Sequence, residues 1–147
     1  GESDKLEQAE EKIKELGLDH LPHLAISAKL ELELSTLSEE EKRELDAPPS
    51  RLSDLISACY KLLNLQTFLT TGPEETRAWT IKKGATAPEA GAAIHSDFQE
   101  KFIRAKIVSY DDLISTGSFA NAHDKGKLRT EGKEYVVREG DVVEFVI

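Results

Sequence analysis

The sequence predicts an α+β protein built from two small units, residues 1–64 and 65–147. Apolar residues recur at helical spacing through most of the first part, whereas the second part contains short runs rich in Thr, Val, Ile and aromatic residues. A hydrophobic fraction of 39% and a charged fraction of 32% are typical of a folded globular chain. Each unit is long enough to bury a core of modest size.

The first unit begins with an amphipathic helix. Apolar positions from Leu6 to Leu16 share one face, and Gly17 stands where a left-handed helix end is favourable. The short apolar run 24–26 predicts a buried strand, which leads through the loop 27–29 into another helix. Helix, strand and helix in this order indicate an α/β arrangement.

Two further helices are predicted before residue 64. Ser38–Glu41 has the capping-box pattern, in which the serine hydroxyl and the glutamate carboxylate satisfy free backbone N–H groups. This helix must end before Pro48. Ser50 then precedes a helix whose apolar residues, from Leu52 to Leu63, share one face. Cys59 lies on that face and is predicted to be a small core residue.

The second unit is predicted to start with a β-hairpin. Residues 66–70 and 76–81 are rich in strand-forming types and flank a turn at 71–74. A second capping box, Thr86–Glu89, then opens a short helix. The strand 103–108 should follow that helix closely.

The rest of the second unit is predicted to contain small strands separated by loops. Apolar runs at 135–137 and 142–147 are bounded by glycine-containing turns, and Asp111–Asp112 indicates the start of a helix. The simplest architecture for this order of elements is a mixed sheet wrapped over one main helix. That is the β-grasp, or ubiquitin-like, arrangement.

Charge and cysteine content exclude several classes of function. The net charge of −9 argues against a surface that coats nucleic acid generally, although residues 77–106 carry six basic side chains against three acidic ones. A single cysteine excludes an intrachain disulfide and a cysteine zinc cluster, and favours a reducing, cytosolic setting. No apolar run approaches the roughly 20 residues of a membrane span. The absence of methionine predicts a fragment or a processed product.

Several isolated polar residues are predicted to have ordinary structural roles. His20 and His23 have too few potential ligands nearby for a metal site and are predicted to be loop histidines. His95 and Asp97 are predicted to cap a helix rather than to act as an acid–base pair. Trp79 is either a core residue or a stacking platform for a base, and burial is favoured.

A set of short motifs resembles one known family. The motifs are Arg-Ala-Trp-Thr-Ile at 77–81, Ile-His-Ser-Asp-Phe at 94–98 and Phe-Ile-Arg-Ala at 102–105. Together they make residues 65–147 similar to the TGS domain of the Obg-like ATPase (YchF) family, whose members are P-loop nucleotide hydrolases. Residues 25–31 resemble the last nucleotide-binding motif of that family's G domain. On this resemblance, residues 1–64 are the rear edge of the G domain.

The resemblance implies a ribosome-associated cytoplasmic protein that hydrolyses ATP in preference to GTP. The resemblance also implies that Ser27, Ala28 and Lys29 form a loop beside the nucleotide base. The physical reason is that loops at the carboxyl ends of parallel strands bind ligands. Without the resemblance, the same residues are more simply a surface turn. The phosphate loop, switch segments, magnesium ligands and Asn-x-x-Glu element are missing from this sequence. We therefore expect no catalytic residue, cofactor or metal in this chain alone, and assign ATP and Mg²⁺ to a whole protein with an N-terminal G domain.

The implied partner of the TGS domain is the ribosome or ribosomal RNA. Its candidate contacts are the basic side chains whose charges can replace the counterions of phosphates. These residues are Lys82, Lys83, Lys101, Arg104 and Lys106. Two alternatives stay open: the lysines are scattered and only solubilise the protein, or the domain senses a small ligand without contacting RNA. No membrane contact is expected.

Overall fold

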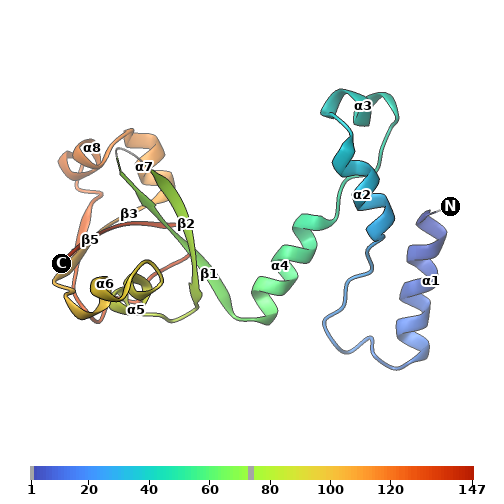
Figure 1. Ribbon diagram of the computed structural model, residues 1–147, viewed down its shortest axis with the longest axis horizontal. Helices are drawn as coiled ribbons and strands as arrows, with labels where there is room; N and C mark the ends of the chain where they lie inside the picture. Colours follow the sequence, from blue (N-terminus) through green and yellow to red (C-terminus); the bar gives the residue numbers. More distant parts are fainter. Residues whose placement is uncertain (1, 73–74) are drawn as a thin grey trace. The chain divides into compact units, whose positions relative to one another are not determined.

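The computed structural model describes residues 2–72 and 75–147, so the tip of the predicted hairpin at 73–74 lies outside the described residues. The chain divides into two compact units, residues 1–62 and 63–147 (Figure 1). Across the part of the chain that is described, every helix is too short or too polar to cross a membrane.

The first unit consists of helices and connecting segments. The helices are α1 (Glu2–Glu15), α2 (Ala28–Thr36), α3 (Glu39–Glu44) and α4 (Leu52–Leu62). The predicted capping box opens α3, since the Ser38 N–H donates to Glu41 Oε2 at 2.8 Å and the Glu41 N–H donates to Ser38 Oγ at 3.3 Å. Gly17 follows α1 with a φ of +67°, as its predicted helix-ending role requires.

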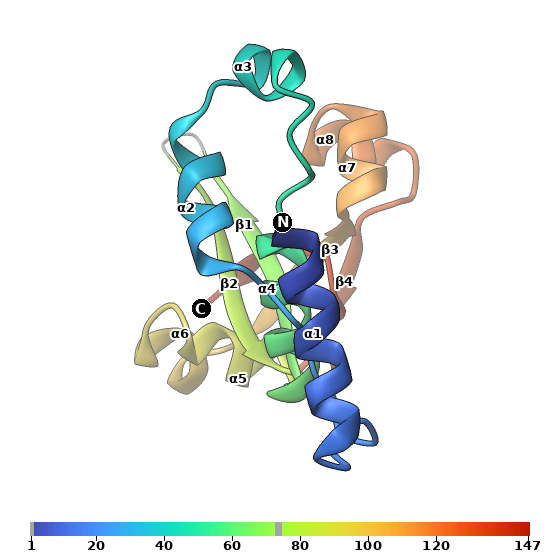
Figure 2. The ribbon, with the colours of Figure 1, turned by 90° about the vertical axis from the view of Figure 1, so that its right-hand side faces the viewer.

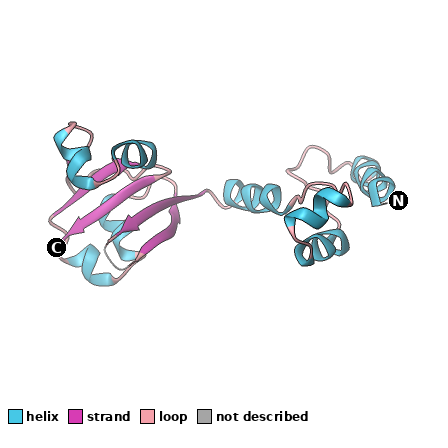
Figure 3. Cartoon of the chain, turned by 90° about the horizontal axis from the view of Figure 1, so that it is seen from above, coloured by secondary structure: helices cyan, strands magenta, loops and turns pink. Residues whose placement is uncertain are grey.

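Three predictions for the first unit are wrong. Residues 24–26 form no strand, because no other described segment of this unit is a strand with which they could pair (Figure 3). Ser27 instead caps α2, so residues 28 and 29 belong to a helix rather than to a loop. Cys59 is exposed and no side chain of α4 is buried, because nothing described in this unit covers the apolar face of the helix.

The second unit contains a five-stranded mixed sheet. Its strands are β1 (Leu65–Thr71), β2 (Thr76–Lys82), β3 (Arg104–Ser109), β4 (Arg129–Glu131) and β5 (Asp141–Val146). They lie in the order β2-β1-β5-β3-β4, with β1 parallel to β5 and every other neighbouring pair antiparallel. This is the β-grasp topology, so the predicted α+β fold is confirmed.

Short helices cover both faces of the sheet (Figures 1 and 2). They are α5 (Ala87–Ala92), α6 (Ser96–Glu100), α7 (Tyr110–Thr116) and α8 (Phe119–Asp124). On one face, Ala87 and Ala90 of α5 pack with buried side chains of the sheet, including Phe68. On the other face, Ala122 of α8 packs with Val108 and Val142. The central strands are therefore buried between two layers of helix.

The prediction for the last third of the chain is partly wrong. Residues 135–137 form only an isolated bridge between Thr86 and Val136, because their backbone groups pair with the segment 85–87 before α5 rather than with a strand. Helix α8, which is capped by Ser118, was not expected. The predicted acidic helix start is present, since Asp111 and Asp112 lie in the first turn of α7.

Gly91 allows α5 and α6 to approach closely. A Cβ atom at this position would lie 2.9 Å from the Cβ of Phe98 and 3.2 Å from its carbonyl oxygen. The Phe98 ring in turn packs edge-on against Phe145, with 5.7 Å between ring centroids. We expect Gly91→Ala to lower the free energy of unfolding of this unit by about 1–3 kcal/mol, as overpacking does. Urea denaturation followed by the fluorescence of Trp79, the only tryptophan, measures this change.

Gly132→Ala is the matched control. Beyond Gly132 and its two chain neighbours, no atom of a described residue lies within 4 Å of the position that a Cβ at Gly132 would take, so we expect the effect of this substitution to stay within about 0.5 kcal/mol. An equal loss of stability in the two variants would contradict the role assigned to Gly91.

Candidate functional site

The segment Ser27–Lys29 forms the beginning of α2. Ser27 has extended backbone angles and its Oγ accepts a hydrogen bond from the Leu30 N–H at 3.3 Å. The side chains of Ala28 and Lys29 are exposed, and Lys29 Nζ lies 3.8 Å from Glu33 Oε1. The first turn of a helix presents backbone N–H groups and the positive end of the helix dipole, which suits a polar ligand. The contact of these residues with a nucleotide base stays a prediction.

Glu31 fixes this helix start to the beginning of α4. Its Oε1 accepts a hydrogen bond from the Arg51 N–H at 2.8 Å, and its Oε2 accepts one from the Ser50 hydroxyl. The hydrogen bond from Ser50, together with that from the Arg51 backbone, holds the pKa of Glu31 below its ordinary value of 4.5. Sequence reasoning did not identify Glu31 or Arg51, because their contacts join segments about 20 residues apart.

The five predicted basic contacts do not gather into one patch. Lys82 pairs with Leu65 at one end of β1, whereas Lys106 pairs with Glu144 of β5. Because Leu69 lies beside Val142 in the parallel pair, Glu144 lies toward the other end of β1. The strand length between these ends separates Lys82 from Lys106 by roughly 20 Å. Lys83 accompanies Lys82, while Lys101 and Arg104 lie near the end of the sheet that holds Lys106.

Ion pairing further divides the basic residues. Lys101 Nζ lies 2.7 Å from Asp97 Oδ2, and Lys106 Nζ lies 2.8 Å from Glu144 Oε1. Lys82 donates to the Leu63 carbonyl oxygen at 3.0 Å. Lys83 and Arg104 are exposed and form no ion pair with any other described residue. Lys82, Lys83 and Arg104 therefore carry the charges not already balanced by a carboxylate.

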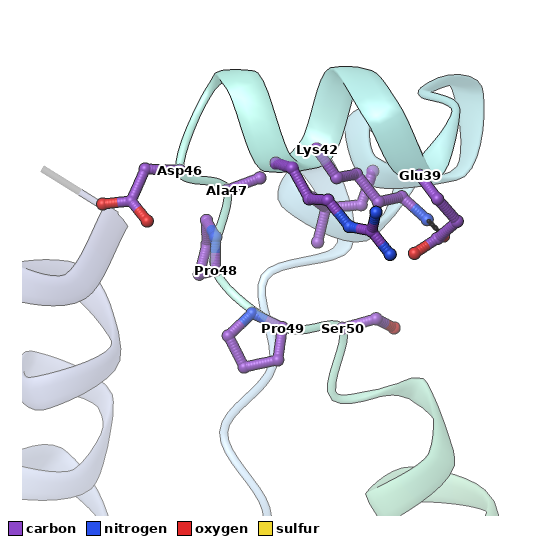
Figure 4. Close-up of a pocket in the computed structure, with 9 residues that line it drawn as sticks. Glu39, Lys42, Asp46, Ala47, Pro48, Pro49 and Ser50 are labelled. Atoms are coloured by element: carbon purple, nitrogen blue, oxygen red, sulfur yellow. Dashed lines mark hydrogen bonds and ion pairs between the residues drawn. The ribbon is translucent and has the colours of Figure 1, made fainter.

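A pocket of about 510 Å³ lies between α3 and the segment that leads to α4 (Figure 4). Pro48, Pro49 and Ser50 form one wall, and Glu39 and Lys42 of α3 form another. The Lys42 ammonium is already paired with Glu39 Oε1 at 2.7 Å. The pocket contains none of the predicted site residues.

A network around the buried Asp141 was not expected from the sequence. The Tyr135 hydroxyl donates to Asp141 Oδ2 at 2.7 Å, and the Arg138 N–H donates to the same oxygen at 2.9 Å. Arg129 donates to the Tyr135 hydroxyl at 3.1 Å. Burial, together with the hydrogen bond to Asp141, raises the pKa of Tyr135 above 10.0. These bonds fix the loop 132–140 to the sheet and provide no open reactive group.

The isolated polar residues have structural roles, as predicted. His95 caps α6, its Nδ1 accepting from the Asp97 N–H at 3.2 Å. His23 lies in a loop, with its ring nitrogens 2.8 Å from the Leu21 carbonyl oxygen and 3.2 Å from Glu10 Oε2. Trp79 packs against the core, donates to Thr70 Oγ1 at 2.9 Å and is covered by the Arg77 guanidinium 4.3 Å from its ring centroid. Within the described ranges, no group of three His, Cys, Asp or Glu side chains could hold a metal ion.

Comparison with known proteins places this architecture in a family. The family YchF-GTPase_C, described as a protein of unknown function (DUF933), matches residues 65–147. The chain belongs to this family. The matched region covers the whole β-grasp sheet and all the helices packed on it.

Relatives of this YchF-family chain extend the similarity into the first unit. The ribosome-binding ATPase YchF of Bacillus subtilis (strain 168) is 50% identical over 126 residues, which are 83% of this chain and 34% of that protein. Obg-like ATPase 1 of Gallus gallus is 42% identical over 140 residues, which are 91% of this chain and 35% of that protein. This chain thus spans about a third of the length of these curated relatives.

A solved structure supports the same assignment. The structure of the Schizosaccharomyces pombe YchF GTPase superimposes with a TM-score of 0.82 at 33% sequence identity. The match covers 96% of this chain and 38% of that one. The sequence-based recognition of the Obg-like ATPase (YchF) family is confirmed.

The hydrogen bonds of Glu31 predict a pH-dependent contribution to stability. Because the pKa of Glu31 is lowered on folding from 4.5, its contribution is fully present above that value and is lost as the pH falls below it. We expect the wild-type chain to melt at a higher temperature than Glu31→Gln at about pH 7, and the difference to shrink at about pH 3. Melting curves recorded by circular dichroism at both pH values measure it.

Glu40→Gln is the control for this comparison, because Glu40 is exposed and forms no ion pair with another described residue. A difference between wild type and Glu31→Gln that stays constant from about pH 7 to pH 3 would show that ionisation of Glu31 does not stabilise the fold.

Proposed function

We propose that this chain is the docking and regulatory part of a ribosome-associated Obg-like NTPase that hydrolyses ATP in preference to GTP. The observation that carries the proposal is the match of the complete β-grasp unit to the YchF-GTPase_C family, together with bacterial relatives that are named ribosome-binding ATPases. The sequence contains no Gly-x-x-x-x-Gly-Lys-Ser/Thr phosphate loop. In this proposal, hydrolysis therefore depends on the rest of the protein, which binds ATP and Mg²⁺. The whole protein is located in the cytoplasm, where ribosomes are found.

In this proposal the second unit, as a TGS domain, binds the ribosome. This unit buries two hydrophobic clusters of its own, one on each face of the sheet, which can hold its surface in place. Lys83 and Arg104 are exposed and unbalanced, which suits contact with the phosphates of ribosomal RNA. Lys101 and Lys106 would contribute less, because a nearby carboxylate balances each charge.

The first unit, in this proposal, completes the G domain. Only two of its apolar side chains are buried among the described residues, Ala25 and Leu34. Many large apolar side chains are exposed instead: Leu16, Leu18, Leu21, Leu32, Leu45, Leu52, Ile56 and Leu62. Such a surface indicates packing against another domain. In that arrangement, Ser27, Ala28 and Lys29 would lie beside the nucleotide base.

Ribosome binding through phosphate contacts predicts a specific order of effects. We expect Arg104→Ala to weaken binding of the whole protein to ribosomal subunits and to reduce the slope of log K against log salt by about one. Lys106→Ala should have a smaller effect, because its charge is balanced by Glu144. Co-sedimentation with ribosomal subunits across a salt series measures both.

Lys125→Ala serves as the control, since Lys125 is exposed and forms no ion pair with another described residue. Binding that is absent at low salt, or that does not depend on salt, would contradict RNA contact through these charges. In that case, a small-ligand-sensing regulatory domain becomes the better reading, and ligand-induced stabilisation of the second unit tests it.

The base-side role of the first unit predicts a loss of nucleotide affinity. We expect Ser27→Ala combined with Lys29→Ala to weaken ATP binding by the whole protein by about tenfold, as the loss of one or two polar contacts does. Isothermal titration with Mg²⁺-ATP measures the dissociation constant. An unchanged constant would argue against participation of this segment, while leaving ribosome binding by the second unit untouched.

A further inference from the structure

Two hydrogen bonds of Arg51 reach residues on either side of the segment 27–29. The Arg51 Nη1 donates to the carbonyl oxygen of Ala25 at 2.8 Å, two residues before Ser27. The Arg51 N–H donates to Glu31 Oε1 at 2.8 Å, two residues after Lys29. A single residue immediately before α4 therefore bonds to the chain on each side of the candidate base-side segment.

The bonds of Arg51 are supported by their surroundings. Arg51 Nε lies 3.7 Å from Asp54 Oδ2, so the first turn of α4 also holds the guanidinium. The Ser50 hydroxyl binds the second oxygen of Glu31, so the carboxylate is bonded on both sides. Ala25 is buried and the bond from Arg51 to its carbonyl oxygen is partly buried, so water competes for this bond less than at an open surface. Both ends of the segment are thus attached to the same short stretch of chain.

We propose that Arg51 and Glu31 are positioning residues that hold Ser27–Lys29 in the conformation that receives a nucleotide base. The inference rests on the proposed function of that segment. Neither residue needs to touch the nucleotide. They act by fixing the carbonyl before the segment and the helical turn that contains it.

The physical basis is preorganisation. Residues 24–26 form no strand in this unit, so the backbone before Ser27 has no sheet ladder to hold it. A segment that is mobile before binding must lose conformational entropy when the ligand arrives, and this weakens affinity. The hydrogen bonds that Arg51 donates to the Ala25 carbonyl oxygen and to the Glu31 carboxylate fix the segment in advance. Because α4 precedes β1 by two residues, the same bonds also attach the segment to the helix that leads to the second unit.

The test compares four variants of the whole protein with wild type. Arg51→Ala removes the side-chain bond to the Ala25 carbonyl oxygen, and Glu31→Ala removes the bonds from Ser50 and from the Arg51 N–H. We expect each variant to weaken Mg²⁺-ATP binding by at least about tenfold, the loss expected for a single charge-assisted hydrogen bond. Glu31→Gln keeps an oxygen for the Arg51 N–H and should retain most of the affinity. Arg43→Ala is the matched control, because Arg43 is exposed and forms no ion pair with a described residue. Isothermal titration with ATP and with GTP gives the affinities.

Amide hydrogen exchange in the same samples provides a readout that does not depend on nucleotide. We expect faster hydrogen exchange confined to residues 26–31 in Arg51→Ala and Glu31→Ala. In the titrations of the same variants, we expect the ratio of ATP affinity to GTP affinity to change. Loss of stability across the whole protein would lower both affinities equally and leave the ratio unchanged, which would overturn the positioning role.

The outcomes separate this inference from the function on which it rests. Unchanged ATP affinity in Arg51→Ala and Glu31→Ala, alongside weaker binding in the Ser27 and Lys29 variant, would overturn positioning while the base-side role stands. Unchanged affinity in all variants would overturn both. Unchanged hydrogen exchange at 26–31 would show that these bonds do not order the segment, and would also overturn the inference.

Discussion

The parallel pairing of β1 with β5 is the interaction on which the second unit depends. These strands lie at the centre of the sheet, and Leu69 lies beside Val142 although they come from opposite ends of the unit. One face of the pair buries Phe68 and Val143 against α5, and the other buries Val142 against α8. The hairpin, the strand pair β3–β4 and the helices all attach to these two strands, so their burial defines both hydrophobic clusters.

Local signals in the sequence predicted those features that depend on neighbouring residues. The capping box at Ser38, the hairpin of β1 and β2, and the helix start at Asp111 each require only residues within one turn or one hairpin. Strands need a partner from elsewhere in the chain. The apolar runs 24–26 and 135–137 are typical of strands, yet the first has no strand to pair with in its unit and the second pairs with a loop.

The candidate site shows the same limit. Ser27–Lys29 could be selected only by family resemblance, because three common residues at a helix start carry little information of their own. Alternation placed Arg104 and Lys106 on one face of β3, and the register agrees. It could not place Lys82, whose position relative to them depends on the order of five strands. Nor could it show that Asp97 and Glu144 balance two of the charges.

The central position of β5 also determines how this unit can fold. The hairpin β1–β2 can form from contacts close in sequence, but β5 alone joins it to β3 and β4. Closing so long a loop before the central contacts form is slow, so the unit gains its stability late and in one cooperative step. A chain that stops before Asp141 would leave the inner edges of β1 and β3 unpaired. Unpaired apolar edges of this kind promote aggregation. By pairing with both edges, β5 therefore protects the unit from aggregation as well as completing the sheet.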